Sequence, residues 1–148
     1  EVEPLLGGPD GILAGLGSGA LFLDCTSGDP AGAQRLAARL AEADIAYADC
    51  PVSGGTNGAE AGTLTVMVGA DPGTFARARP VLACFGKRIE HLGAVGSGSA
   101  LKAVNNALLA ANILTFAEGQ FQTLNLGSDW SRCAGHWRSS TPPPAGPL

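Results

Sequence analysis

Along this chain, short apolar runs alternate with segments in which apolar residues recur at helical spacing. This alternation is the sequence feature that limits the possible folds most strongly. Ala20–Asp24 is an apolar run that ends in an acid, which is typical of a buried strand in a parallel sheet. Pro30–Ala43 follows with apolar residues at helical spacing, and Asp29 supplies an N-cap in front of it. Ile45–Ala48 is the next short strand. A strand, a helix and a strand within about 30 residues form a βαβ unit, so the sequence predicts an α/β fold.

The expected elements continue along the chain. They are a short helix within Pro9–Leu16, a loop over Asp49–Gly62, a strand over Thr63–Gly69, a helix from Asp71 that Pro80 breaks or kinks, a strand over Arg88–Leu92, a glycine loop over Gly93–Ser99 and a long helix from Ser99 to Glu118. Thr63–Gly69 is continuously apolar and rich in β-branched residues, which indicates a central strand. Gln120–Leu148 holds both tryptophans and little periodicity, so an irregular, poorly packed tail is expected there.

Composition and charge exclude several classes of protein. The 148 residues carry a formal net charge of −4, and the few positive charges are scattered, so the chain lacks the basic surface that nucleic acid requires. No run of about 18 apolar residues is free of charged or turn-forming residues, so no membrane span is expected. Apolar residues make up 45% of the chain, which is too many for wholesale disorder. The length suits one domain with a hydrophobic core.

The four cysteines are Cys25, Cys50, Cys84 and Cys133, and they form no CxxC pair and no metal-like spacing with histidine. We expect them to be reduced, buried cysteines of an intracellular protein. The chain begins with Glu1 and shows no signal peptide, so we expect a segment of a longer cytoplasmic protein. A targeting segment ahead of it would instead direct it to mitochondria or another organelle.

Lys102 is the one formally charged residue between Glu90 and Glu118, in a chain with just two lysines. An unpaired ammonium group is costly to bury among apolar residues. Asn106 lies four residues further on and shares a helix face with Lys102. A lysine and an amide on one face of a buried helix can grip and deprotonate a small polar substrate. The alternative is a first-turn lysine whose side chain extends to water.

Two loops hold further candidate residues, each with a structural alternative. Pro51–Gly55 contains two glycines, and its backbone N–H groups form either an anion-binding nest for a carboxylate or a simple strand-ending turn. Thr26 and Ser27 follow a strand at its carboxyl end, where ligands bind in open α/β sheets. They either donate hydrogen bonds to a cofactor or form a local turn.

Neither glycine cluster is a dinucleotide-binding fingerprint. Gly15–Gly19 precedes a strand instead of following one, and Gly96–Gly98 opens a helix without the third glycine at the required spacing. The sequence contains no paired carboxylates, no Ser-His-Asp set and no metal-ligand spacing, so no metal site is predicted. His91, at a strand end, is expected to be a structural histidine.

Three motifs in register resemble the β-hydroxyacid dehydrogenase family, which includes 3-hydroxyisobutyrate dehydrogenase and, more distantly, 6-phosphogluconate dehydrogenase. They are Asp49–Gly55 with Gly58-Ala59 and Gly62–Gly69, then Gly86-Lys87 with His91–Gly93, and finally Gly96–Asn106. Asp24–Ser27 is similar to the family's nicotinamide-side turn, with the usual Ser-Thr order reversed. The resemblance covers roughly residues 10–119.

The resemblance implies an NAD(P)-dependent oxidoreductase. Its substrate would be a small 3-hydroxy acid, such as 3-hydroxyisobutyrate, which it oxidises, or the matching semialdehyde, which it reduces. Lys102 would be the general acid/base on the substrate hydroxyl, and Asn106 would orient that hydroxyl or an adjacent carboxylate. The implied binding residues are Ser53, Gly54 and Gly55 for the substrate carboxylate, and Thr26 or Ser27 for the nicotinamide end of NAD or NADP.

The resemblance also implies that the chain corresponds to the inner portion of a longer enzyme. Residues 1–97 would be the C-terminal portion of a Rossmann-like NAD(P)-binding domain without its first βαβ half. Residues 98–119 would begin an interdomain helix, and 120–148 would be a tail unlike the family. We therefore expect homo-oligomers in the full-length family and no turnover by this chain alone. The alternative is a truncated, non-catalytic relative that serves as an interaction or structural module.

Overall fold

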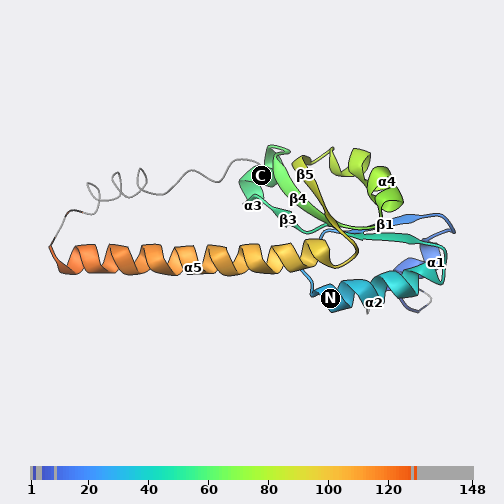
Figure 1. Ribbon diagram of the computed structural model, residues 1–148, viewed down its shortest axis with the longest axis horizontal. Coiled ribbons are helices and arrows are strands. Elements are labelled where there is room, and N and C mark those ends of the chain that lie inside the picture. Colours follow the sequence, from blue (N-terminus) through green and yellow to red (C-terminus); the bar gives the residue numbers. More distant parts are fainter. Residues whose placement is uncertain (1, 3–4, 9, 128, 130–148) are drawn as a thin grey trace. The chain divides into compact units, whose positions relative to one another are not determined.

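A computed structural model describes residues 2, 5–8, 10–127 and 129 of the chain (Figure 1). The chain divides into two compact units, Glu1–Asn105 and Asn106–Leu148. The first unit holds the sheet, the helices around it and the start of the long helix α5. The second unit holds the remainder of α5. The predicted α/β class with one long helix after the sheet is confirmed.

Five short strands form one mixed sheet. They are β1 (Leu21–Asp24), β2 (Ala46–Asp49), β3 (Val52–Ser53), β4 (Leu64–Gly69) and β5 (Gly86–Gly93). The pairs β1–β2 and β4–β5 are parallel, whereas β2 and β3 both pair antiparallel with β4. The central position predicted for β4 is confirmed. The sheet is therefore mixed and not parallel throughout.

Asp49–Gly62 is not the single loop that the sequence predicts. It contains β3 and a short helix, α3 (Gly55–Glu60). Val52 pairs with Val66, and Ser53 pairs with Thr65. A strand of two residues has no periodicity of its own, so only its distant partners on β4 define it.

The other helices of the first unit are α1 (Ile12–Gly15), α2 (Pro30–Ala41) and α4 (Pro72–Leu82). Each Asp-Pro pair starts its helix as predicted. Asp29 accepts a hydrogen bond from the Gly32 N–H at 2.9 Å, and Asp71 accepts one from the Gly73 N–H at 2.9 Å. Helix α4 continues through Pro80 to Leu82, so Pro80 does not break the helix, and the alternative that it kinks the helix stays a prediction.

Two hydrophobic clusters lie on opposite faces of the sheet. Tyr47 packs with Leu36 and Leu40 of α2, whereas its neighbour Ala48 packs with Leu82 of α4. Successive residues of a strand point to opposite faces, so β2 contributes to both clusters. Helices α2 and α4 therefore cover the two faces (Figure 1), which is the layered arrangement of an α/β domain.

Helix α5 (Ser97–Asn125) is longer than the helix predicted from Ser99 to Glu118. Gln120–Asn125 contains no proline or glycine, so nothing in that segment ends a helix. The end comes at Gly127, whose φ of 69° is the left-handed conformation common just after a helix. The rest of the expected tail, from residue 130 onward, lies outside the described residues.

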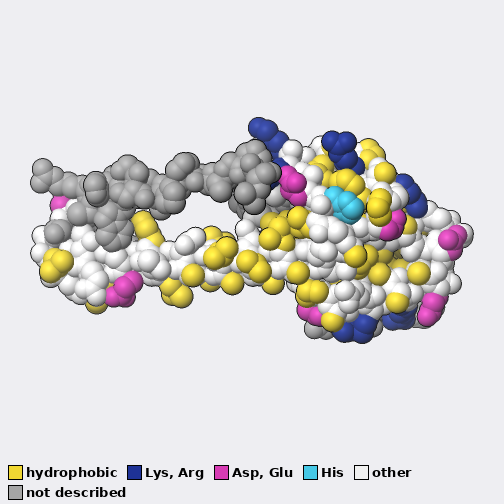
Figure 2. Space-filling view, viewed as in Figure 1, with side chains coloured by type: hydrophobic (Ala, Val, Ile, Leu, Met, Phe, Trp, Pro, Cys, Tyr) yellow, Lys and Arg dark blue, Asp and Glu magenta, His cyan; other side chains and the backbone are white. Residues whose placement is uncertain are grey.

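Large hydrophobic side chains are exposed along α5, as Figure 2 shows. Leu108 is 60% exposed, Ile113 59% and Leu114 70%. Among the described residues, α5 is the one helix long and apolar enough to cross a membrane by length and composition. Such a helix does not establish a span, because core helices of soluble proteins share these properties. The expectation of no membrane span stays a prediction.

Cys25, Cys50 and Cys84 are free, which agrees with the reduced state predicted for them. Cys50 alone among these three is buried, and burial raises the pKa of its thiol to about 12. Cys25 and Cys84 are exposed, so the prediction of burial is wrong for both. Cys133 lies outside the described residues.

Candidate functional site

The carboxyl end of β1 holds a compact hydrogen-bonded turn. Asp24 Oδ1 accepts from the Thr26 N–H at 2.9 Å and from the Thr26 hydroxyl at 2.6 Å. The Tyr47 hydroxyl donates to Asp24 Oδ2 at 3.1 Å. Burial, followed by the charge of Asp24, raises the Tyr47 pKa well above its ordinary value, so this phenol stays a donor at neutral pH. The donors of Thr26 are therefore used within the turn, which is the local-turn alternative for this residue, and the contact of Thr26 and Ser27 with a cofactor stays a prediction.

A cavity of about 640 Å³ opens beside this turn. Thr26 and Ser27 line it, as does Ser99 in the first turn of α5. Arg35 and Arg39 of α2 also line it, and neither was predicted from the sequence as a site residue. Their spacing of four residues places them on one polar face of α2, and this signal was available in the sequence.

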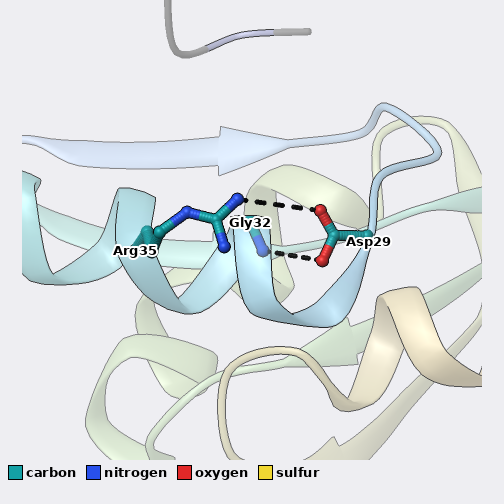
Figure 3. A network of polar contacts seen from close by, with 3 residues as sticks. All are labelled: Asp29, Gly32 and Arg35. Atoms are coloured by element: carbon teal, nitrogen blue, oxygen red, sulfur yellow. Dashed lines mark hydrogen bonds and ion pairs between the residues drawn. The ribbon is translucent and has the colours of Figure 1, made fainter.

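Asp29 connects the start of α2 to one of these arginines (Figure 3). Its Oδ1 accepts from the Gly32 N–H, and its Oδ2 lies 3.9 Å from the Arg35 guanidinium. Both charged side chains are more than 60% exposed, so the ion pair itself contributes little stability. The Asp29 carboxylate offsets part of the positive charge of Arg35 at this end of the cavity.

Ser53, Gly54 and Gly55 lie at the junction of β3 and α3. Gly54 has a φ of 137° and Gly55 a φ of 63°, both of which favour glycine. A Cβ atom on Gly54 would also lie 2.9 Å from the Leu64 side chain. Backbone conformation and the Leu64 contact thus explain why glycine occupies these positions, without any role in binding. The carboxylate-binding role of this loop stays a prediction, and none of its three residues lines the cavity described above.

Lys102 lies on α5, three residues after Ser99, and is half-buried. Residues three apart on a helix share a face, so Lys102 follows the cavity-lining Ser99 along the same side of α5. Asn106 is exposed and is the first residue of the second unit. Lys102 and Asn106 are one helical turn apart, as predicted, and their catalytic roles stay predictions.

Asp49 is a further residue that sequence reasoning missed. It is 1% exposed, and its two carboxylate oxygens accept from the backbone N–H groups of Gly96 and Ser99, each at 2.7 Å. Asp49 thereby caps the first turn of α5 from the end of β2. A signal was present in the sequence, since an acid ends this apolar strand, whereas α5 begins without an acidic residue of its own.

His91 has the structural role predicted for it. Its Nε2 lies 2.8 Å from the Ala70 carbonyl oxygen, and its ring stacks on Phe75 with 4.4 Å between the ring centroids. Within the described part of the chain, no group of three or more His, Cys, Asp and Glu side chains is arranged to hold a metal ion.

The cavity residues fit the nicotinamide end of a dinucleotide in their chemistry. Hydroxyl groups at the carboxyl end of a strand suit a ribose or a carboxamide, and arginines suit a phosphate. The Gly-x-Gly-x-x-Gly turn that binds the pyrophosphate in such domains is absent from the described residues.

Residues 1–93 match the family model for the NAD-binding domain of 6-phosphogluconate dehydrogenase. This chain belongs to the β-hydroxyacid dehydrogenase family. The family resemblance proposed from the motifs is therefore confirmed, and so is NAD or NADP as the cofactor class of its NAD-binding domain.

Relatives of this β-hydroxyacid dehydrogenase chain support the assignment. The chain is 47% identical over 117 residues to 2-(hydroxymethyl)glutarate dehydrogenase of Eubacterium barkeri. The matched region covers 79% of this chain and 39% of that relative. A solved 3-hydroxyisobutyrate dehydrogenase of Mycobacterium tuberculosis with L-serine has 38% identity and a TM-score of 0.73, covering 80% of this chain and 40% of that one. Psf3, solved with NADP⁺ and 2-OPP, has 32% identity and a TM-score of 0.81, and the match covers 87% of this chain and 45% of Psf3. The chain thus spans about two fifths of the length of the curated relatives it matches.

Proposed function

We propose that this chain forms part of the active site of an NAD(P)-dependent dehydrogenase that oxidises a small 3-hydroxy acid or reduces the matching semialdehyde. The substrate class follows from the relatives, which include a 3-hydroxyisobutyrate dehydrogenase solved with L-serine. The observation that carries the proposal is the shared wall of the cavity. Thr26 and Ser27 from the turn after β1 and Ser99 from α5 line one space, and Lys102 follows Ser99 on the same helix face.

The proposed chemistry divides between the cofactor and the chain. NAD(P), when bound, accepts or supplies the hydride at C4 of the nicotinamide. The Lys102 amine takes the proton of the substrate hydroxyl during oxidation and returns it during reduction. Asn106 orients that hydroxyl or an adjacent carboxylate.

The substrate carboxylate is assigned to the backbone N–H groups of the Ser53–Gly55 loop. The positive φ values of Gly54 and Gly55 turn the chain sharply there, which suits successive N–H groups that converge on an anion. Thr26 and Ser27 contact the nicotinamide end of the cofactor. Because the Thr26 hydroxyl already donates to Asp24, it is left as an acceptor, and it suits the carboxamide N–H₂.

A hybrid enzyme tests the activity. In it, the 117 residues of this chain that match the Eubacterium barkeri relative replace the corresponding segment of that relative. We expect NAD(P)-dependent turnover of at least one small 3-hydroxy acid, followed by nicotinamide absorbance. A folded hybrid that binds NADH but turns over none of a panel of 3-hydroxy acids would contradict the proposal.

We also propose that the chain by itself does not turn over, because neither of its glycine clusters has the spacing of a pyrophosphate-binding turn. Fluorescence titration of the isolated chain with NADH and NADPH measures whether it binds the cofactor that turnover requires. No observation in the described residues specifically favours the non-catalytic alternative.

A further inference from the structure

The carboxylate of Asp49 connects the end of β2 to the first turn of α5. Both of its oxygens accept backbone N–H groups at 2.7 Å, and the side chain is buried. Hydrogen bonds to an ionised acceptor are among the stronger ones in proteins, and the N-terminus of a helix favours a negative charge. The start of α5 is therefore bound to the sheet by a charged group that water does not reach.

A close backbone approach reinforces this connection. A Cβ atom on Gly98 would clash with the Met67 carbonyl oxygen and lie 2.8 Å from the Asp49 carbonyl oxygen. Only glycine therefore permits the observed distance between α5 and the sheet. A Cβ atom on Gly69 would in turn clash with Asp49 Oδ1, so the Asp49 carboxylate also has a glycine beside it. The distance between the first turn of α5 and the sheet is thus limited by a glycine on each side, Gly98 on α5 and Gly69 on β4.

Lys102 depends on this turn for its position. The Ala100 N–H bonds to the Gly96 carbonyl oxygen at 2.9 Å, so regular helix begins where Asp49 binds. Lys102 is three residues beyond Ser99, within the same unit of the chain as Asp49 and the cavity. A shift of the Ser99 N–H therefore carries the Lys102 side chain with it.

We propose that Asp49 is a positioning residue for Lys102: its buried carboxylate fixes the first turn of α5 and thereby the position of the Lys102 side chain, three residues beyond the cavity-lining Ser99. This inference rests on the proposed function for the importance of Lys102. Asp49 does not line the cavity, and both of its oxygens accept backbone N–H groups, so its role is to position the helix.

The chain contains just two lysines, and this makes a direct test possible. Lys87 is exposed, and its acetylation rate serves as an internal reference for Lys102. In Asp49→Asn, the side-chain N–H₂ faces one backbone N–H, so one of the two hydrogen bonds is lost. We expect the ratio of the Lys102 to Lys87 acetylation rates, measured by peptide mass spectrometry on the whole chain, to change.

Asp71→Ala is the matched control, because it removes another aspartate that caps a helix through two backbone N–H groups. It should lower stability and leave the acetylation ratio at the wild-type value. A folded Asp49→Asn variant with the wild-type ratio would overturn the proposal, and so would a ratio that changes equally in both variants.

If Asp49→Asn does not fold, amide hydrogen exchange on the wild-type chain tests whether the first turn of α5 is bound to β2. The proposal predicts that the Lys102 amide exchanges at the rate of the β2 amides, because both open together. A Lys102 amide that exchanges more than about tenfold faster, which corresponds to roughly 1.4 kcal/mol, would overturn it. These readouts need no turnover. If the hybrid enzyme is inactive while they behave as predicted, the proposed function fails and the connection between Asp49 and Lys102 stands.

Discussion

Thr26 donates both its backbone N–H and its hydroxyl to Asp24 Oδ1, at 2.9 and 2.6 Å. The hydroxyl therefore presents only lone pairs to the cavity that it lines. A cofactor group bound there by Thr26 must be a donor, and the nicotinamide carboxamide is one.

The Thr26 hydroxyl should accordingly contribute to nicotinamide affinity. We expect Thr26→Val to weaken NADH binding to the hybrid enzyme about fivefold, the factor given by one neutral hydrogen bond of about 1 kcal/mol. Thr26→Ser keeps the hydroxyl and should retain affinity. Equal affinity in Thr26→Val and the wild type, measured by nicotinamide fluorescence, would contradict this assignment.

Asp71 should make stability depend on pH in acid. Hydrogen bonds from the Thr74 side chain and backbone, and then from the Gly73 N–H, lower its pKa from the ordinary 3.8. A carboxylate whose pKa is lowered on folding stabilises the fold above its unfolded pKa, and this contribution is lost as pH falls through the folded pKa. Asp71→Ala should therefore cost about 1 kcal/mol at neutral pH, a typical value for an N-cap.

Urea unfolding at neutral pH and again below pH 3.8 measures this effect. The difference between the wild type and Asp71→Ala should shrink in acid. A difference that is the same at both pH values would show that the carboxylate is not the stabilising group.

The exposed hydrophobic side chains of α5 should drive association of the chain. Exposed apolar patches of this kind are typical of interaction surfaces. We expect the molar mass from light scattering to rise with protein concentration, and Ile113→Lys to reduce that rise. Gln122→Lys adds the same charge at an exposed polar position of α5 and is the control. A wild-type chain that stays monomeric at all concentrations would contradict this prediction.

Much of the fold could be predicted from local sequence. Asp29 and Asp71, each followed by proline, mark the starts of α2 and α4, and the apolar run at Leu64–Gly69 marks the central strand. The elements that could not be predicted depend on distant partners. The two residues of β3 form a strand only because Val66 and Thr65 pair with them.

The candidate site shows the same division. Lys102 stands out in the sequence because no other charge is near it, whereas Asp49 looks like an ordinary acid at the end of a strand. Its partners Gly96 and Ser99 lie 47 and 50 residues away, and no local pattern connects them. The extra length of α5 was missed for a simpler reason. The composition of Gln120–Leu148 as a whole predicts an irregular tail, although its first six residues, Gln120–Asn125, are compatible with a helix.

The role of Lys102 is the central claim, and a pair of lysine variants in the hybrid enzyme tests it most directly. Lys102→Ala should lower kcat about 10²–10⁴-fold, the usual contribution of a general acid/base, with NADH affinity unchanged. Lys87→Ala removes the other lysine, which is exposed on β5, and should leave kcat at the unmodified level. If Lys102→Ala keeps kcat within the range of Lys87→Ala, or loses turnover and NADH binding together, Lys102 is not the acid/base of this site.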